Sequence, residues 1–164
     1  MSEVKFTPWT SRLSKIIRQP GGTTVQGALK DAKRNLEKIR LECILEIDFK
    51  LDVMQQKFGQ ARQKPNETDL DELYRLSNDI VGMAGVFEMT ELGEAAFSLC
   101  ELIDRLKAPD QWDWPAVELH LSGMRVLRYS KPGQPENQAV LDGLRKLTAR
   151  VDARRELGKP STAG

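Results

Sequence analysis

A chain of 164 residues is long enough for one domain with its own hydrophobic core, without disulfides or a structural metal to support it. Aromatic residues make up only 6% of the sequence and strand-type alternation of apolar and polar residues is missing, so an all-α protein is expected. The 25 basic and 24 acidic residues are mixed along the chain, which argues against a nucleic-acid-binding surface.

Residues 1–22 are expected to form a leader with one short amphipathic helix. Apolar residues at helical spacing indicate this helix: Trp9, Leu13, Ile16 and Ile17. A Pro-Gly-Gly turn at residues 20–22 ends it, and its polar side is basic. The preferred interpretation is a lid over one end of the main domain, and the alternative is a helix that binds a membrane surface or a partner.

A much longer helix is expected to begin near Thr23, which has capping-box spacing to Gln26, and to end at Phe58. Its apolar residues recur every three or four positions: Val25, Leu29, Ala32, Leu36, Ile39, Cys43, Ile47, Leu51, Met54 and Phe58. At 1.5 Å per residue, such a helix is on the order of 50 Å long. It either kinks, packs its projecting part on the leader and the last helix, or supports a dimer.

Four shorter helices are expected to follow. The first of them begins at Thr68 and is followed by a break around residues 88–90. The next carries apolar residues from Leu92 to Leu106, the third is capped by Asp113, and the last carries apolar residues from Val140 to Val151. Because the connecting turns are short, neighbouring helices should run antiparallel in an up-down bundle. The bundle then covers residues 23–157, and residues 158–164 form a flexible tail.

The segment from Leu76 to Phe87 is the most informative part of the chain. Asn78, Val81, Gly82 and Ala84 stand at the spacing of the pattern His-x-x-Lys-Gly-x-Ala-x-x-x-Gly, and a Leu-rich helix follows. This segment resembles the phosphoacceptor helix of histidine phosphotransfer (HPt) domains, with asparagine in place of the reactive histidine. The resemblance, closest over residues 74–104, implies an antiparallel four-helix bundle of HPt type with a short extra N-terminal helix.

In HPt domains the acceptor histidine projects into solvent and a receiver domain docks around it. The resemblance assigns Asn78 to the acceptor position, Val81 to the position that usually supplies a cation for the phosphate, and Gly82 to the position that leaves room for the receiver. An amide nitrogen cannot act as the nucleophile, and valine offers no charge to phosphate oxygens. The later glycine of the pattern is Glu88. We therefore expect no phosphotransfer at Asn78 and no enzymatic activity.

The helix face around Asn78 is expected to bind a partner. Tyr74, Val81, Gly82 and Gly85 share this face. Glycine inside a helix costs about 1 kcal/mol relative to alanine, so two glycines on one side indicate a close approach to the backbone. An outside partner is preferred for Gly82, and a neighbouring helix for Gly85. The sequence thus predicts a non-catalytic protein of two-component phosphorelay signalling that binds a response-regulator receiver domain or a sensor histidine kinase.

His120 is the only histidine, so any imidazole chemistry must use it. It shares an apolar stripe with Val117, Leu121 and Met124, which favours a hydrogen-bonded core or boundary histidine. The alternative is a displaced phosphoacceptor, which would make the chain an active phosphotransfer protein. A further alternative is a dimeric structural bundle outside signalling.

Cys43 and Cys100 are far apart in helical patterns and are expected to be buried, reduced thiols. One histidine and two separated thiols indicate neither a metal site nor a cofactor site. No apolar run approaches the roughly 18 residues that a membrane span needs. The N-terminus lacks the pattern of a signal peptide. A cytoplasmic protein without an integral membrane segment is therefore expected.

Overall fold

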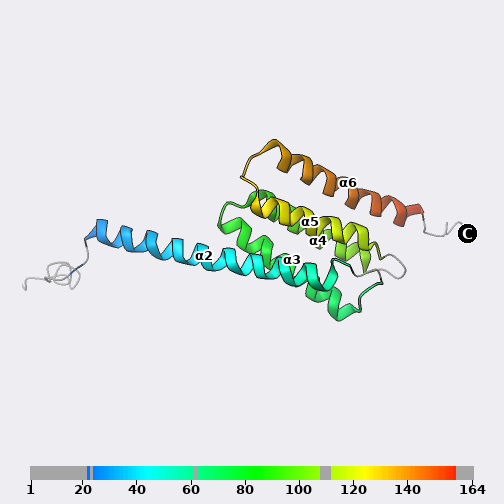
Figure 1. Ribbon diagram of the computed structural model, residues 1–164, viewed down its shortest axis with the longest axis horizontal. Coiled ribbons are helices and arrows are strands. Elements are labelled where there is room, and N and C mark those ends of the chain that lie inside the picture. The colour runs from blue at the N-terminus through cyan, green and yellow to red at the C-terminus, as the bar shows by residue number, and fades with distance from the viewer. Residues whose placement is uncertain (1–21, 23, 61–62, 108–111, 158–164) are drawn as a thin grey trace, which may run out of the picture. The chain divides into compact units, whose positions relative to one another are not determined.

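The computed structural model describes residues 22, 24–60, 63–107 and 112–157. The described residues form five α-helices: α2 (Val25–Phe58), α3 (Glu67–Val86), α4 (Thr90–Leu106), α5 (Trp114–Tyr129) and α6 (Pro135–Leu157). The all-α prediction is therefore confirmed (Figure 1). The chain divides into two compact units, residues 1–39 and residues 40–164, with the boundary inside α2. The leader helix and the tail lie outside the described residues.

Two helix starts differ from the sequence prediction. The first residue of α2 is Val25, and the hydroxyl oxygen of Thr24 accepts a hydrogen bond from the backbone N–H of Gly27 at 3.1 Å. Asn66 caps α3, because its side-chain oxygen accepts from the N–H of Asp69 at 2.8 Å. These side chains satisfy N–H groups that the first helical turn leaves open. The apolar residues expected in the last helix, from Val140 to Val151, all lie in α6, which begins at Pro135.

The cap predicted for α5 is confirmed. The side-chain oxygen of Asp113 accepts a hydrogen bond from the N–H of Ala116 at 3.1 Å, and Pro115 lies in the first turn. Proline is tolerated there because its missing N–H would have no helical partner. This short local signal fixes the start of α5.

In the unit formed by residues 40–164, α4 packs against α3, α5 and α6, and Figure 1 shows these helices side by side. Buried apolar side chains of α4 reach all three neighbours: Leu92, Ala95, Ala96, Leu99, Leu102, Ile103 and Leu106. The later part of α2 adds Ile47, Leu51, Met54 and Phe58 to the same core. Fully burying one such large side chain stabilises the fold by about 1.5–3 kcal/mol.

Ion pairs hold the later part of α2 to α3 and α5. Lys50 Nζ lies 3.0 Å from Asp79 on α3. On α5, Arg128 Nε lies 2.9 Å from Asp48, and Arg125 pairs with Asp52. Because the Arg125 pair is about half exposed, it contributes little stability by itself. Together the pairs set this later part of α2 beside α3 and α5.

In residues 25–39, by contrast, the apolar stripe of α2 is exposed. The large side chains of Val25, Leu29, Leu36 and Ile39 are 49–78% accessible. The three-and-four spacing predicts one buried face along the whole helix, but the side chains with this spacing are buried only from Ile47 onward.

The turn between α3 and α4 contains a strained residue. Glu88 has a φ of 58°, in the left-handed region that favours glycine, and it is the one non-glycine residue with positive φ in the described part of the chain. The N–H of Met89 donates to the carbonyl oxygen of Ala84 at 3.0 Å and closes the turn. The break between helices that is expected around residues 88–90 is confirmed, because α3 ends at Val86 and α4 begins at Thr90.

We expect Glu88→Gly to raise the free energy of unfolding by about 0.5–1 kcal/mol, because relief of the left-handed strain exceeds the entropy that glycine adds to the unfolded chain. The matched control Ala139→Gly, at an exposed position of α6, should lower it by about 1 kcal/mol. Urea unfolding followed by circular dichroism measures both. A loss of stability in Glu88→Gly would contradict the strain argument.

Candidate functional site

Asn78 lies exposed on α3. Gly82, one turn further along the helix, is also exposed, and a Cβ built there would meet no atom within 4 Å. The space beside Asn78 is therefore open to solvent, and a second molecule could approach the α3 backbone there.

Gly85 is likewise exposed, with no atom within 4 Å of a built Cβ. The expectation that a neighbouring helix of the same chain approaches Gly85 is therefore wrong. The close crossing of α3 and α4 uses Gly93 instead, whose built Cβ would lie 3.4 Å from Cβ of Ala84. Both glycines of the Asn78 face are left free of neighbouring helices.

Tyr74 and Val81 are half-buried and form the apolar border of this face. Both pack against the hydrophobic core. The ammonium group of Lys107 lies 5.3 Å from the ring centroid of Tyr74, within the range of a cation–π contact. All five residues predicted for the Asn78 face thus lie on one side of α3, from the half-buried Tyr74 to the exposed Gly85.

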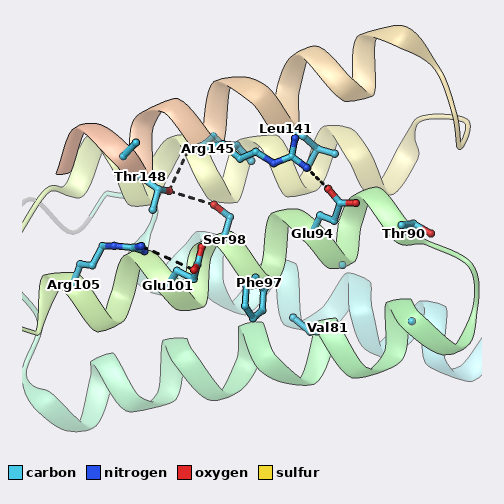
Figure 2. Close-up of a pocket in the computed structure, with 14 residues that line it drawn as sticks. Val81, Thr90, Glu94, Phe97, Ser98, Glu101, Arg105, Leu141, Arg145 and Thr148 are labelled. Atoms are coloured by element: carbon cyan, nitrogen blue, oxygen red, sulfur yellow. Dashed lines mark hydrogen bonds and ion pairs between the residues drawn. The ribbon is translucent and has the colours of Figure 1, made fainter. Parts of the chain in front are cut away.

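A groove of about 760 Å³ runs along the same side of the molecule, between α3, α4 and α6. Figure 2 shows Val81 of α3 and Phe97 of α4 in this groove. The Phe97 side chain is 56% exposed, which is unusual for an aromatic ring within a packed helix. The groove continues to α6, where Leu141 and Thr148 line it. The Asn78 face and the groove share Val81 and Gly85.

Two ion pairs lie along the groove (Figure 2). Arg145 of α6 lies 2.5 Å from Glu94 of α4, and Arg105 lies 4.0 Å from Glu101 within α4. Each pair combines one positive and one negative group. The charged groups therefore give the groove little net charge, and its lining is mainly apolar in character between them.

His120 lies behind the groove, fully buried between α4, α5 and α6. Its Nδ1 is 2.8 Å from the carbonyl oxygen of Ala116, which can only accept, so Nδ1 carries the proton. The other nitrogen, Nε2, then accepts from the hydroxyl of Ser98 at 3.1 Å. The hydroxyl of Thr148 lies 3.2 Å from that of Ser98 and donates to the carbonyl oxygen of Leu144 at 3.1 Å.

This network confirms the interpretation of His120 as a hydrogen-bonded core histidine. Burial lowers the pKa of His120, and the hydrogen bond to Ala116 opposes that effect in part. A hydroxyl donating to a neutral imidazole could in principle be activated as a nucleophile. However, Ser98 is only 7% exposed and lies inside α4, where the neighbouring N–H groups are used by the helix. A displaced acceptor role for His120 would require an exposed ring, which the structure does not provide.

Sequence reasoning missed Phe97, Ser98 and Thr148 as residues of this region. Phe97 did carry a signal, because it falls outside the apolar stripe of α4 and an aromatic residue off the core stripe marks an exposed apolar position. Ser98 and Thr148 carried none, since a hydroxyl facing a distant histidine can be found only from the packing of α6.

Both cysteines are free. Cys100 is buried, as expected, and burial raises the pKa of its thiol, whereas Cys43 is only half-buried. Among the described residues, no group of three or more His, Cys, Asp and Glu side chains could hold a metal ion. None of the described helices has both the length and the apolarity needed to cross a membrane.

Comparison with models of protein families, with curated proteins and with solved structures found no match to this chain.

We expect His120 to make stability depend on pH. In the folded protein the pKa of His120 lies below the ordinary 6.5. As the pH falls, the unfolded chain therefore binds a proton at His120 before the folded chain does. The stabilisation is therefore complete above pH 6.5 and is lost as the pH drops toward the folded pKa.

The variant His120→Gln cannot titrate at this position. At about pH 7.5 it should unfold about 1–3 kcal/mol more easily, because a buried hydrogen-bonded group is lost. Between about pH 7 and pH 5 its stability should fall less steeply than that of the unchanged protein. Urea titrations at several pH values measure both effects, and parallel pH profiles for the two proteins would refute the role of His120.

Proposed function

We propose that this chain is a non-catalytic, HPt-like protein of two-component signalling, which binds a receiver domain, or a sensor histidine kinase, without carrying phosphate. The observation that carries the proposal is the exposed amide of Asn78 beside the open backbone at Gly82. In the HPt pattern these two positions belong to the acceptor and to the docking space next to it. A solvated helix face with no partner would be expected to carry charged side chains there instead.

The backbone at Glu88 gives independent support. The HPt pattern has a glycine at this position, and here the backbone keeps a glycine-like φ of 58° although the residue is glutamate. A strained non-glycine residue is retained where the turn geometry requires it. The turn is thus compatible with the HPt pattern even though the residue has changed.

The apolar surface beside Asn78 suits protein binding. Val81 and the exposed Phe97 border the groove, and the paired Glu94 and Arg145 provide a polar rim. An apolar centre with an aromatic residue and a charged rim is the usual composition of a protein interface. The partner would contact Asn78 and Gly82 on α3 and extend toward Phe97 on α4.

Binding without phosphate follows from the side chains at the acceptor position. The Asn78 amide is no nucleophile, and Val81 provides no positive charge for a phosphoryl group in transfer. Such a protein would compete with an active phosphotransfer protein for the same receiver, sequester the receiver, or act as a scaffold.

We expect Gly82→Arg to abolish binding to receiver domains. The site is sterically open, so the arginine should be accommodated by the fold but occupy the docking space. Gly143→Arg is the matched control, because Gly143 is an equally open, exposed helical glycine on α6 outside the groove lining. Titration calorimetry against a panel of purified receiver domains measures binding, and circular dichroism checks the fold of both variants.

If Gly82→Arg and Gly143→Arg bind a receiver equally well, the docking face is not around Asn78. If the unchanged protein binds no receiver or sensor kinase in the panel, the proposed function is wrong.

A second experiment restores the chemistry. The double variant Asn78→His, Val81→Lys rebuilds His-x-x-Lys-Gly on α3, where position 78 is exposed and position 81 is half-buried. Given a phosphorylated receiver that binds the unchanged protein, it should acquire acid-labile phosphate on the introduced histidine, while Asn78→His alone should acquire less because it lacks the cation. Mass mapping locates the label. Phosphate on His120 of the unchanged protein would instead identify the chain as an active phosphotransfer protein.

A further inference from the structure

The first part of α2, residues 25–39, exposes a row of large apolar side chains. Val25 is 78% exposed, Leu29 58%, Leu36 61% and Ile39 49%, and the exposed Ala32 lies between them. Isolated exposed apolar residues are ordinary, but a continuous row on one helix indicates an interaction surface.

The spacing of this row identifies the kind of partner. Successive residues are four, three, four and three positions apart, which is the a/d spacing of a heptad repeat: Val25, Leu29, Ala32, Leu36, Ile39. The opposite side of the helix carries charged residues such as Arg34, whose side chain is 73% exposed. A narrow apolar stripe with a charged back fits another helix that packs by knobs-into-holes contacts.

We propose that residues 25–39 associate with the same residues of a second copy of this chain, as a short parallel coiled coil. This surface is separate from the Asn78 face and does not depend on the proposed function.

The charges beside the stripe and the number of apolar layers favour this occupant and this direction. In a parallel pair in register, Ala28 lies opposite the partner's Lys33, so no like charges meet there. An antiparallel pair sets an a residue opposite a d residue, so only four of the five apolar layers can meet within residues 25–39, whereas all five meet in the parallel pair. The net charge of the whole chain is only +1, so two copies do not repel each other strongly.

The apolar layers also determine how strongly the copies associate and how many helices the coiled coil contains. Two heptads form a short coiled coil, so association should be visible only as the protein concentration rises. Leucine at the a positions (Leu29, Leu36) with β-branched Val25 and Ile39 at d positions favours three or four strands over two. The surface is therefore expected to associate beyond a pair of chains, to three or four copies, as the protein concentration rises.

The first test compares Leu36→Lys with Leu45→Lys. Both leucines lie on α2 and are 61% exposed, but nine residues separate them, which places them on opposite sides of the helix. By sedimentation velocity over a concentration series, the unchanged protein should self-associate, and Leu36→Lys should weaken association at least about tenfold. Leu45→Lys should associate like the unchanged protein. A strictly monomeric unchanged protein, or equal weakening in both variants, would overturn the proposal.

The second test fixes the direction of the strands. In a background with Cys43→Ser and Cys100→Ala, with its fold checked by circular dichroism, Ala32→Cys should form an intermolecular disulfide in mild oxidant, because d positions meet in a parallel pair. Arg34→Cys, on the opposite side, should not. Equal cross-linking of the two variants, or none at Ala32, would contradict a parallel coil. Receiver binding should be unchanged in Leu36→Lys, which separates this result from a failure of the Asn78 face.

Discussion

The packing of α4 against three helices is the constraint on which the rest of the C-terminal unit depends. A helix with neighbours on three sides must place small or apolar side chains around most of its circumference, and α4 does so with Ala95, Ala96 and Leu99. Close contact with α3 is made possible by Gly93, opposite Ala84. Little of the α4 surface then remains exposed, and Phe97 is the large apolar side chain of α4 that is exposed.

This arrangement connects the candidate docking face to the core. The α4 backbone that holds Phe97 at the surface also positions the hydroxyl of Ser98 against His120. On the α3 side, the hydroxyl of Ser77, which is next to Asn78 in the chain, donates to the carbonyl oxygen of Ala96 at 2.8 Å. The Asn78 face is thus presented by two helices fixed to each other by buried hydrogen bonds and apolar contacts. A preorganised surface loses less entropy on binding than a mobile one.

The sequence predicted those features that are set by local chemistry. The cap at Asp113 and the break at Glu88 depend on residues within a few positions, and both were found. The buried stripe of α2 was predicted only in part. The same three-and-four spacing runs through Leu36 and Ile47, but only Ile47 is covered, since periodicity identifies a helix face and not its neighbour.

The candidate site shows the same limit. Asn78 and Gly82 were predicted from a pattern in one helix, and both lie exposed on α3. Gly85 was expected to face a neighbouring helix, and it does not, because glycine permits a close approach without identifying what approaches. Ser98 and Thr148 lie 50 residues apart and meet only because α6 packs on α4. No local pattern encodes such a meeting.

The hydrogen bonds of His120 have a practical consequence. Ser98 and Thr148 line the groove and also contact the imidazole, so a molecule entering the groove would alter the surroundings of the ring. The chain contains a single histidine, and its imidazole resonances in a nuclear magnetic resonance spectrum therefore arise from one known place. Occupancy of the groove can thus be read from inside the protein, without attaching a label to the surface under study.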